Sequence, residues 1–432
     1  MPKETKRINA DWRTALEKLD KFIREKPESS RGSRSLTEGL DPRARELVSG
    51  VLRHRSRLES FWQGFVKKQP KGRLRTLLLL ALWDVVRGDR EQPLAQVVDH
   101  AVAQIALHCS PREKNFANAI LRKTAPLARK AWNCEDLPPP SEWPVFFSHP
   151  PELIRRWQNA FGLEATEQLL RWNNTPGENY VRWRDPKTLP PEACRETPWK
   201  DFYKLSSTAW PEIREALHAG KAYIQDPATR GLRECLNDFS GTRFFDACAA
   251  PGGKILLAAD SLRLSRREDM HFVAMDKKGA RFRKLRENLS NASLAEKIDL
   301  LAGDLRTDLR PQLQAAQLPT AFDAVLLDVP CSNTGVFRRR PEARWHWSEE
   351  AFSLLTRQQE QFLENGATAV ASGGLLIYST CSIEEEENQA VVSRFLDSAG
   401  GEKFALETSR VFYPWIDGHD GAGLFALRRI SK

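Results

Sequence analysis

The stretch DACAAPGGK, residues Asp246–Lys254, joins a short apolar segment to a glycine loop. From about Tyr223 onward, apolar segments of this kind alternate with helical patterns, which is typical of a parallel α/β sheet. We therefore expect an α/β domain in the C-terminal half of the chain. Its predicted strands are 243–246, 271–275, 298–301, 324–327 and 375–378.

Each predicted strand ends at or just before a polar or small residue that can face a ligand. Because ligands of open α/β sheets bind beyond the carboxyl ends of the strands, these endings predict one shared site. The features concerned are the glycine loop, Asp276, Asp304, Asp328 and Cys381.

The glycine loop lacks the two common nucleotide-binding patterns. A phosphate loop requires glycine where Cys248 stands and Ser or Thr where Ile255 stands, and the pattern G-x-G-x-x-G is absent. What remains is a small-residue turn that lets a cofactor approach the backbone. An ordinary tight turn is the alternative interpretation.

Two aspartates at strand ends indicate the kind of ligand. Asp276 can accept hydrogen bonds from both hydroxyls of a ribose, and Asp304 can accept one from an adenine amino group. Either residue alone is weak evidence, because aspartate commonly caps a following helix. Together with a loop that has no pyrophosphate motif, they indicate S-adenosylmethionine as the cofactor.

Two cysteines, Cys331 and Cys381, follow predicted strands in LLDVPCS (Leu326–Ser332) and YSTCS (Tyr378–Ser382). A thiolate that adds to C6 of cytosine makes the poorly nucleophilic C5 reactive, and a later elimination restores the ring. Asp328 is placed to act on N3 and the exocyclic amine of such a base. An isolated cysteine is more often a small buried hydrophobe, but two at neighbouring strand ends favour catalysis.

The chain before the sheet divides into two parts. Up to about Ala131, apolar residues recur at three- and four-residue steps without strand signals, which predicts a helical domain. The segment Leu137–Ser141 contains three prolines and breaks any helix. A helix over Leu153–Trp172 and a strand-like Tyr180–Arg184 then predict a small α+β neck. The predicted domains are 1–137, 138–220 and 221–432.

The composition suits a globular protein with a polyanionic partner. The 432 residues include 66 Lys and Arg against 57 Asp and Glu, a net charge of +9, although an ordinary basic surface would also fit. Seven cysteines without a C-x-x-C pair argue against a disulfide framework and a zinc site, and indicate reduced thiols in the cytoplasm. We expect no signal peptide and no membrane span.

Three motifs together resemble those of a known family. DACAAPGGK, DVPCSNTG and YSTCSIEEEEN are similar to motifs of the Sun/Fmu group of RNA cytosine-C5 methyltransferases, bacterial small-subunit (16S) rRNA enzymes related to the eukaryotic Nop2/Sun proteins. NFANAILR (Asn115–Arg122) resembles part of the group's NusB-like RNA-binding domain, and DGHDG (Asp417–Gly421) its C-terminal hairpin. The resemblance implies a multidomain fold with an all-α NusB-like domain, a small α+β neck and a Rossmann-like α/β domain.

The resemblance also implies a role for each matching residue. Cys381 is the implied nucleophile and Cys331 the thiol that assists product release, with Asp328 and Lys254 as further catalytic residues. The implied contacts of S-adenosylmethionine are Cys248, Ala249, Ala250, Pro251, Gly252, Gly253, Lys254, Asp276, Asp304 and Asp328.

Three surfaces are predicted to contact RNA. Lys114, Asn118 and Arg122 fall at four-residue steps on one helix face, a basic stripe that suits phosphates but is equally typical of a solvated face. The neck offers Arg182–Arg184, and Arg338–Trp347 mixes cations with aromatic rings, as a splayed base requires. The neck segment and Arg338–Glu342 also depart from the family pattern, as does Ile255, which stands where the family usually has threonine.

The predicted function is methylation of cytosine C5 in RNA, namely 16S rRNA, through a covalent Cys–C6 intermediate. The predicted cofactor is S-adenosylmethionine, and the enzyme is expected to be a monomer without metal or membrane. One alternative is cytosine-C5 methylation of another rRNA position or of tRNA. The other is a non-catalytic RNA-binding assembly or antitermination factor, which the presence of both Cys331 and Cys381 disfavours.

Overall fold

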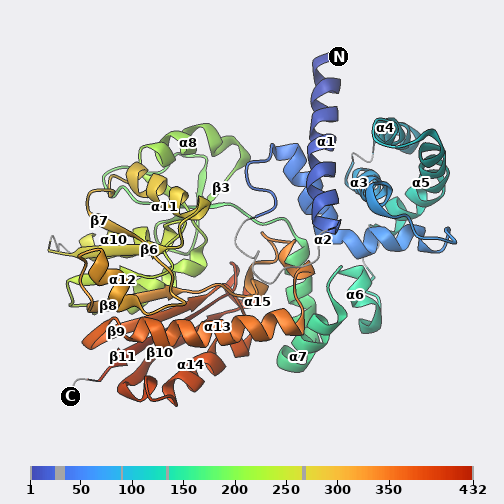
Figure 1. The fold of residues 1–432 in the computed structure, drawn as a ribbon. Coiled ribbons are helices and arrows are strands. Elements are labelled where there is room, and N and C mark those ends of the chain that lie inside the picture. Colours follow the sequence, from blue (N-terminus) through green and yellow to red (C-terminus); the bar gives the residue numbers. More distant parts are fainter. Residues whose placement is uncertain (1, 25–34, 89–90, 133–135, 265–268, 431–432) are drawn as a thin grey trace. The chain divides into compact units, whose positions relative to one another are not determined.

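The computed structural model describes residues 2–24, 35–88, 91–132, 136–264 and 269–430. The chain folds into two compact units (Figure 1). Unit 1 comprises Met1–Thr175 and Phe337–Trp347, and unit 2 comprises Pro176–Val336 and Ser348–Lys432. The division into three domains stays a prediction, and the boundary at Thr175–Pro176 falls inside the predicted neck, 138–220.

Unit 1 is helical, as the spacing of its apolar residues predicts. Its central helix α3 carries the leucine-rich run Leu77–Leu82, which is completely buried because α1, α2, α4 and α5 all pack against it. Helix α2 begins at Pro42, since proline is well suited to the first turn of a helix. The helices of this unit are α1 (Pro2–Arg24), α2 (Pro42–Gln63), α3 (Gly72–Arg87), α4 (Leu94–Ala106), α5 (Pro111–Trp132), α6 (Trp143–Phe146) and α7 (Pro151–Asn174), with short 3-10 turns at Pro140–Glu142 and Ala343–Trp345.

Unit 2 begins with a small sheet in the order β2-β3-β1-β4, in which every neighbouring pair is antiparallel. The alternation in this segment leaves Val181 and Ala222 buried against the helix α8. The elements are β1 (Tyr180–Trp183), β2 (Cys194–Glu196), β3 (Phe202–Leu205), α8 (Trp210–His218) and β4 (Ala222–Ile224), with a 3-10 turn at Ser207–Ala209.

The rest of unit 2 is a seven-stranded sheet in the order β10-β11-β9-β8-β5-β6-β7. The five predicted strands are all present as the parallel strands β5 to β9, and only β10 and β11 run antiparallel. This confirms a Rossmann-like α/β fold. The strands are β5 (Arg243–Asp246), β6 (His271–Asp276), β7 (Ile298–Ala302), β8 (Phe322–Asp328), β9 (Val370–Thr380), β10 (Phe404–Phe412) and β11 (Ala422–Arg429).

Helices cover both faces of this sheet (Figure 1). One buried cluster joins strand residues such as Val325 to α12, α13 and α14, and the other joins residues such as Phe244 to α9, α10 and α11. The helices are α9 (Gly231–Cys235), α10 (Gly253–Leu264), α11 (Ala280–Asn291), α12 (Leu309–Ala315), α13 (Glu349–Ala367), α14 (Gln389–Leu396) and α15 (Pro414–Asp417), with 3-10 turns at Pro227–Arg230, Thr334–Val336, Glu385–Glu387 and Gly401–Lys403. In the described part of the chain, no helix combines the length and the apolarity that crossing a membrane requires.

The prediction that Arg338–Trp347 offers cations and rings to RNA is wrong for its central residues. Arg344 has no exposed surface, and its guanidinium donates to the backbone carbonyls of Arg53 (3.3 Å) and Asn173 (3.1 Å). The Nε1 of Trp345 donates to Leu52 O at 2.7 Å. These groups therefore serve the interior of unit 1, where buried carbonyls need donors.

The neck arginines are also not an RNA surface. Arg182 is 1% exposed, and its Nη1 lies 2.6 Å from Asp260 Oδ2. Arg184 shares the same carboxylate, with Nε at 2.8 Å from Oδ2 and Nη2 at 2.9 Å from Oδ1. Both cations are therefore paired with Asp260 of α10, and the prediction that the neck arginines bind RNA is wrong.

The packing of α2 on α3 gives a test of the helical unit. A Cβ on Gly50 would lie 2.0 Å from Cε2 of Trp83, whose ring is held by a 2.8 Å hydrogen bond to Glu46. Gly50→Ala should therefore lower the free energy of unfolding by about 1 to 3 kcal/mol, as overpacking does. Urea unfolding followed by circular dichroism measures this change.

Gly64→Ala is the matched control, because Gly64 has a right-handed helical conformation and nothing within 4 Å of its added Cβ. Equal stability of the two variants would contradict the close packing of Gly50 on Trp83.

Candidate active site

Three strand ends bring predicted site residues to one edge of the seven-stranded sheet. Asp276 ends β6, Asp328 ends β8, and Cys381 directly follows β9. These strands all run parallel through β5, so that their carboxyl ends lie on the same edge. The pairing of Asp328 with Ser379 places the turns after β8 and β9 next to each other.

The glycine loop connects β5 to α10 at this edge. The backbone N–H of Ala250 donates to Asp276 Oδ2 at 2.9 Å, which fixes the loop against the end of β6. Gly252 has a φ of 113°, a conformation that favours glycine. A Cβ on Gly253 would lie 3.1 Å from Cε1 of Tyr223, so the ring of Tyr223 packs closely on the loop at a position that leaves little room for a larger residue.

A buried carboxylate lies at the start of the loop. Asp246 has no exposed surface, and its Oδ1 accepts the N–H of Cys248 at 3.2 Å. Its Oδ2 has no hydrogen-bond partner among the described residues. Burial, together with the nearby charge of Asp328, raises the pKa of Asp246 well above its ordinary value. A buried oxygen without a partner is one that a ligand donor can satisfy.

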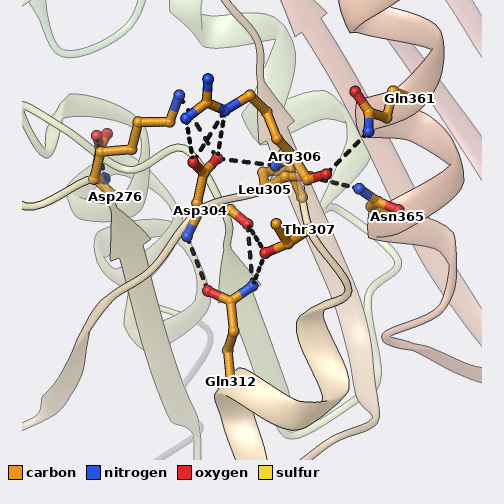
Figure 2. Close-up of polar contacts among 9 residues, drawn as sticks. Asp276, Asp304, Leu305, Arg306, Thr307, Gln312, Gln361 and Asn365 are labelled. Carbon is orange, nitrogen blue, oxygen red and sulfur yellow. Dashed lines mark hydrogen bonds and ion pairs between the residues drawn. The ribbon is translucent and has the colours of Figure 1, made fainter.

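The Asp304 carboxylate is engaged within the chain (Figure 2). Arg306 donates to it, with Nη2 2.6 Å from Oδ2, and Lys277 Nζ lies 3.6 Å from Oδ1. The hydrogen bonds from Arg306 lower the pKa of Asp304. Gln312 Oε1 accepts the backbone N–H of Asp304 at 2.9 Å and holds the turn. An adenine amino group would therefore have to share this carboxylate with Arg306.

The two thiols lie in direct contact. Cys331 Sγ is 2.8 Å from Cys381 Sγ and accepts the backbone N–H of Cys381 at 3.2 Å. Cys381 Sγ also lies 3.3 Å from Oδ1 of Asn333. Cys331 is buried, whereas Cys381 is partly exposed. Burial, then the hydrogen bond with Cys381, raises the pKa of Cys331 well above its ordinary value.

An ion pair completes this edge. Lys254 Nζ lies 2.6 Å from Asp328 Oδ1. Burial opposes the charged form of Lys254, but the charge and the hydrogen bond of Asp328 outweigh it and raise the pKa of Lys254. Lys254 is therefore a cation that holds the Asp328 side chain. The same lysine and Cys381 border a small cavity, whose other lining residues include Asp226, Thr229, Thr380 and Asp420.

The sequence interpretation gave no role to Glu387. This residue has no exposed surface, and its carboxylate accepts the backbone N–H of Ser332 (2.8 Å), the Ser332 hydroxyl and Gln359 Nε2 (3.0 Å). It therefore fastens the turn that carries Cys331. The only signal for it is its place in the acidic run after Cys381, where four consecutive glutamates look alike.

The residues at this edge fit S-adenosylmethionine. Asp246 Oδ2 is a buried oxygen with no partner among the described residues, and Asp276 stands at the end of the neighbouring strand. The loop between them is made of small residues, and Gly252 has a positive φ. When bound, this cofactor supplies an electrophilic methyl group. Among the described residues, no group of three or more His, Cys, Asp or Glu side chains is placed to hold a metal ion.

This fold and this edge of the sheet define an S-adenosylmethionine-dependent methyltransferase. Residues 234–414 match the family model described as 16S rRNA methyltransferase RsmB/F, and residues 8–126 match the NusB family. The chain is therefore similar to the RsmB/F methyltransferases over most of the seven-stranded sheet and to the NusB family over its helical N-terminal part. The resemblance read from the three motifs is confirmed, and so are the predicted enzyme class and cofactor.

Curated relatives agree over most of the chain. A ribosomal RNA small subunit methyltransferase B from Pasteurella multocida is 28% identical over 413 residues, which cover 90% of this chain and 88% of the relative. The protein of the same name from Serratia proteamaculans is 29% identical and covers 89% of each chain.

Solved structures share the fold. The crystal structure of PH0851 has a TM-score of 0.74 at 20% identity and covers 98% of this chain and 99% of its own. A methyltransferase homologue protein from Pyrococcus horikoshii has a TM-score of 0.55 at 23% identity and covers 68% of this chain and 100% of its own. At these identities the likeness supports the fold alone.

The hydrogen bonds of the buried Glu387 carboxylate give a test of the site. Glu387→Gln replaces one accepting oxygen by an NH2 group that faces other donors, so the turn after β8 should shift. Displacement of a catalytic group by about 1 Å can cost about 100-fold in rate. We therefore expect methyl transfer at saturating RNA and S-adenosylmethionine to slow about 10- to 100-fold, with unchanged affinity for S-adenosylmethionine by calorimetry.

Glu385→Gln is the control, because Glu385 is exposed in the same acidic run. If the Glu387→Gln enzyme were as fast as the Glu385→Gln enzyme, Glu387 would not be needed to position Cys331 for catalysis.

Proposed function

We propose that this enzyme transfers the methyl group of S-adenosylmethionine to C5 of a cytosine in 16S rRNA. The observation that carries the proposal is the contact of two thiols beside the Lys254–Asp328 ion pair, at the edge where the cofactor fits. The RsmB/F family model and the names of the curated relatives support small-subunit rRNA as the substrate.

Cys381 is the proposed nucleophile. Its thiolate forms a bond to C6 of the base, and the electron pair of the C5–C6 double bond moves so that C5 becomes nucleophilic. After methylation, water takes the proton from C5, the electron pair of that C–H bond restores the C5–C6 double bond, and the C6–S bond breaks to return the thiolate. Two differences from Cys331 favour Cys381 for this role, namely its partial exposure and its place in the cavity lining.

Cys331 is proposed to assist the elimination. It lies within 2.8 Å of Cys381 Sγ, so it is close to the bond that must break. Its raised pKa keeps it a neutral thiol while Cys381 attacks, which avoids two adjacent negative charges.

Asp328 and Lys254 are proposed to position the base. Asp328 would accept from the exocyclic amine of cytosine, and from N3 once that nitrogen carries a proton, since it stands at the end of β8, three residues before Cys331. Lys254 would hold the Asp328 carboxylate in place through their 2.6 Å ion pair. Its positive charge also suits a site where electrons gather on the ring.

The cofactor contacts are proposed at the glycine loop and the two following strand ends. Asp276 would accept from the ribose hydroxyls while keeping its hydrogen bond from Ala250, since a carboxylate has several lone pairs. Asp304 would accept from the adenine while it pairs with Arg306. The remaining proposed contacts are Cys248, Ala249, Ala250, Pro251, Gly252, Gly253, Lys254 and Asp328.

RNA contact by the NusB-family domain is proposed for one face of α5. Lys114 is exposed there, whereas Arg122 donates to Asn118 at 3.1 Å and to Asp99 at 3.1 Å, both near the surface. An RNA phosphate would therefore compete with Asp99 for Arg122. We also propose that the enzyme is a cytoplasmic monomer, since ribosomal RNA is its proposed substrate.

Variants of the two thiols test the mechanism. Cys331→Ala should stall after addition to C6 and leave methylated RNA covalently attached to Cys381, because release is impaired. Cys381→Ala and the double variant should form no adduct. Denaturing gel electrophoresis with labelled RNA reads this directly as a slow protein-linked band.

Cys235→Ala is the control, since Cys235 packs among apolar residues next to α10 and should release its product normally. Retained binding of S-adenosylmethionine shows that each variant is folded. A band from Cys381→Ala but not from Cys331→Ala would exchange the two roles, and no band from either would contradict the covalent mechanism.

A further inference from the structure

A second cavity opens at the opposite edge of the seven-stranded sheet. It is lined by the segments that precede or begin β8 and β9, where Thr320, Ala321 and Val370 lie, and by Arg429 at the end of β11. Because β11 runs antiparallel to β9, its last residues lie at the amino ends of β8 and β9. The active site lies at their carboxyl ends, so this cavity has no part in it.

Three cations from three separate elements line this cavity. They are Arg310 of α12, Lys403 at the end of the 3-10 turn before β10, and Arg429 of β11. Arg429 Nη1 donates to Val370 O, and Arg310 Nη2 contacts Thr368 O at 3.4 Å. These contacts keep the guanidinium groups on the wall of the cavity.

In the part of the chain that the structure describes, these three charges have no paired acidic side chain. The lining contains no Asp or Glu, and within the described residues none of the three cations takes part in an ion pair. The neighbouring Arg428 differs, because its Nε and Nη2 each lie 2.8 Å from Glu407. Successive side chains of a strand point to opposite faces. Arg428 is therefore paired with Glu407, whereas Arg429 lines the cavity.

The remaining lining groups identify the kind of anion. Thr320, Thr368 and Ser372 bring hydroxyls, and Gln314 brings an amide, all of which can donate to oxygen. The lining contains no aromatic residue on which a base could stack. Cations and neutral donors without rings fit phosphate oxygens rather than nucleobases.

We propose that this cavity binds backbone phosphates of the substrate RNA, away from the target base. The identity of the polyanion rests on the proposed function. Three cations in one open cavity match a ligand with successive phosphates, because each neutralised phosphate releases counterions and so adds to the affinity. Unit 2 would thus contact RNA through this cavity, in addition to the contact proposed for the NusB-family domain in unit 1.

A triple variant, Arg310→Gln with Lys403→Gln and Arg429→Gln, tests this site in the full-length enzyme. RNA dissociation constants are measured by fluorescence anisotropy over a series of salt concentrations. Each lost phosphate contact removes about 0.7 from the slope of log affinity against log salt for a single strand, so the slope should fall by about two units. Affinity for S-adenosylmethionine and the rate of methyl transfer at saturating RNA should not change.

Arg428→Gln is the matched control, because it removes one charge from the same strand but from a residue that Glu407 already pairs. The single variant Lys403→Gln, at an exposed position, replaces the triple variant if the latter does not fold, and should lower the slope by about 0.7. A slope equal to that of the Arg428→Gln enzyme would overturn the inference.

Two further results separate the possible sources of the anion. Loss of inorganic phosphate binding in the triple variant, with an unchanged RNA slope, would make this a small-anion site and overturn the inference. A lowered RNA slope in an enzyme that methylates no cytosine would sustain the inference while the proposed function failed.

Discussion

The parallel pairing of β8 with β9 sets the position of both thiols. Asp328 lies opposite Ser379, so the turns after the two strands meet and Cys331 comes within 2.8 Å of Cys381. Each turn is a short polar loop that could not place its thiol without the other strand. A slip of one residue would send the side chains of β9 to the opposite face and separate the site. The buried carboxylate of Glu387 then fixes the turn after β8.

The two edges of this sheet also differ in the charge of their side chains. Its carboxyl edge gathers Asp246, Asp276 and Asp328, of which Asp328 forms an ion pair with Lys254. Its amino edge carries the cations of the second cavity without a carboxylate among them. An RNA phosphate is therefore attracted to the amino edge, while the carboxyl edge suits the cofactor and one base. A polyanionic substrate and a carboxylate-rich site can thus coexist in one small unit.

Local patterns predicted the fold well. The five parallel strands follow from short apolar runs that each end at a polar residue, and the helices of unit 1 follow from apolar spacing, because both signals are contained within a few residues. Local patterns could not predict which residues the individual arginines contact. Arg182 and Arg344 read as RNA-binding residues, yet their partners Asp260 and Asn173 lie far away in the sequence. Glu387 was missed because four consecutive glutamates give no sign of which one is buried.

The most direct test of the proposed function is to map the product. The enzyme is incubated with methyl-labelled S-adenosylmethionine and unmodified 16S rRNA, and each labelled nucleotide is identified by mass spectrometry after digestion. The proposed function predicts 5-methylcytosine at a defined position, absent when Cys381→Ala replaces the enzyme. A label on another base or on another atom of cytosine, or equal labelling by Cys381→Ala, would contradict it.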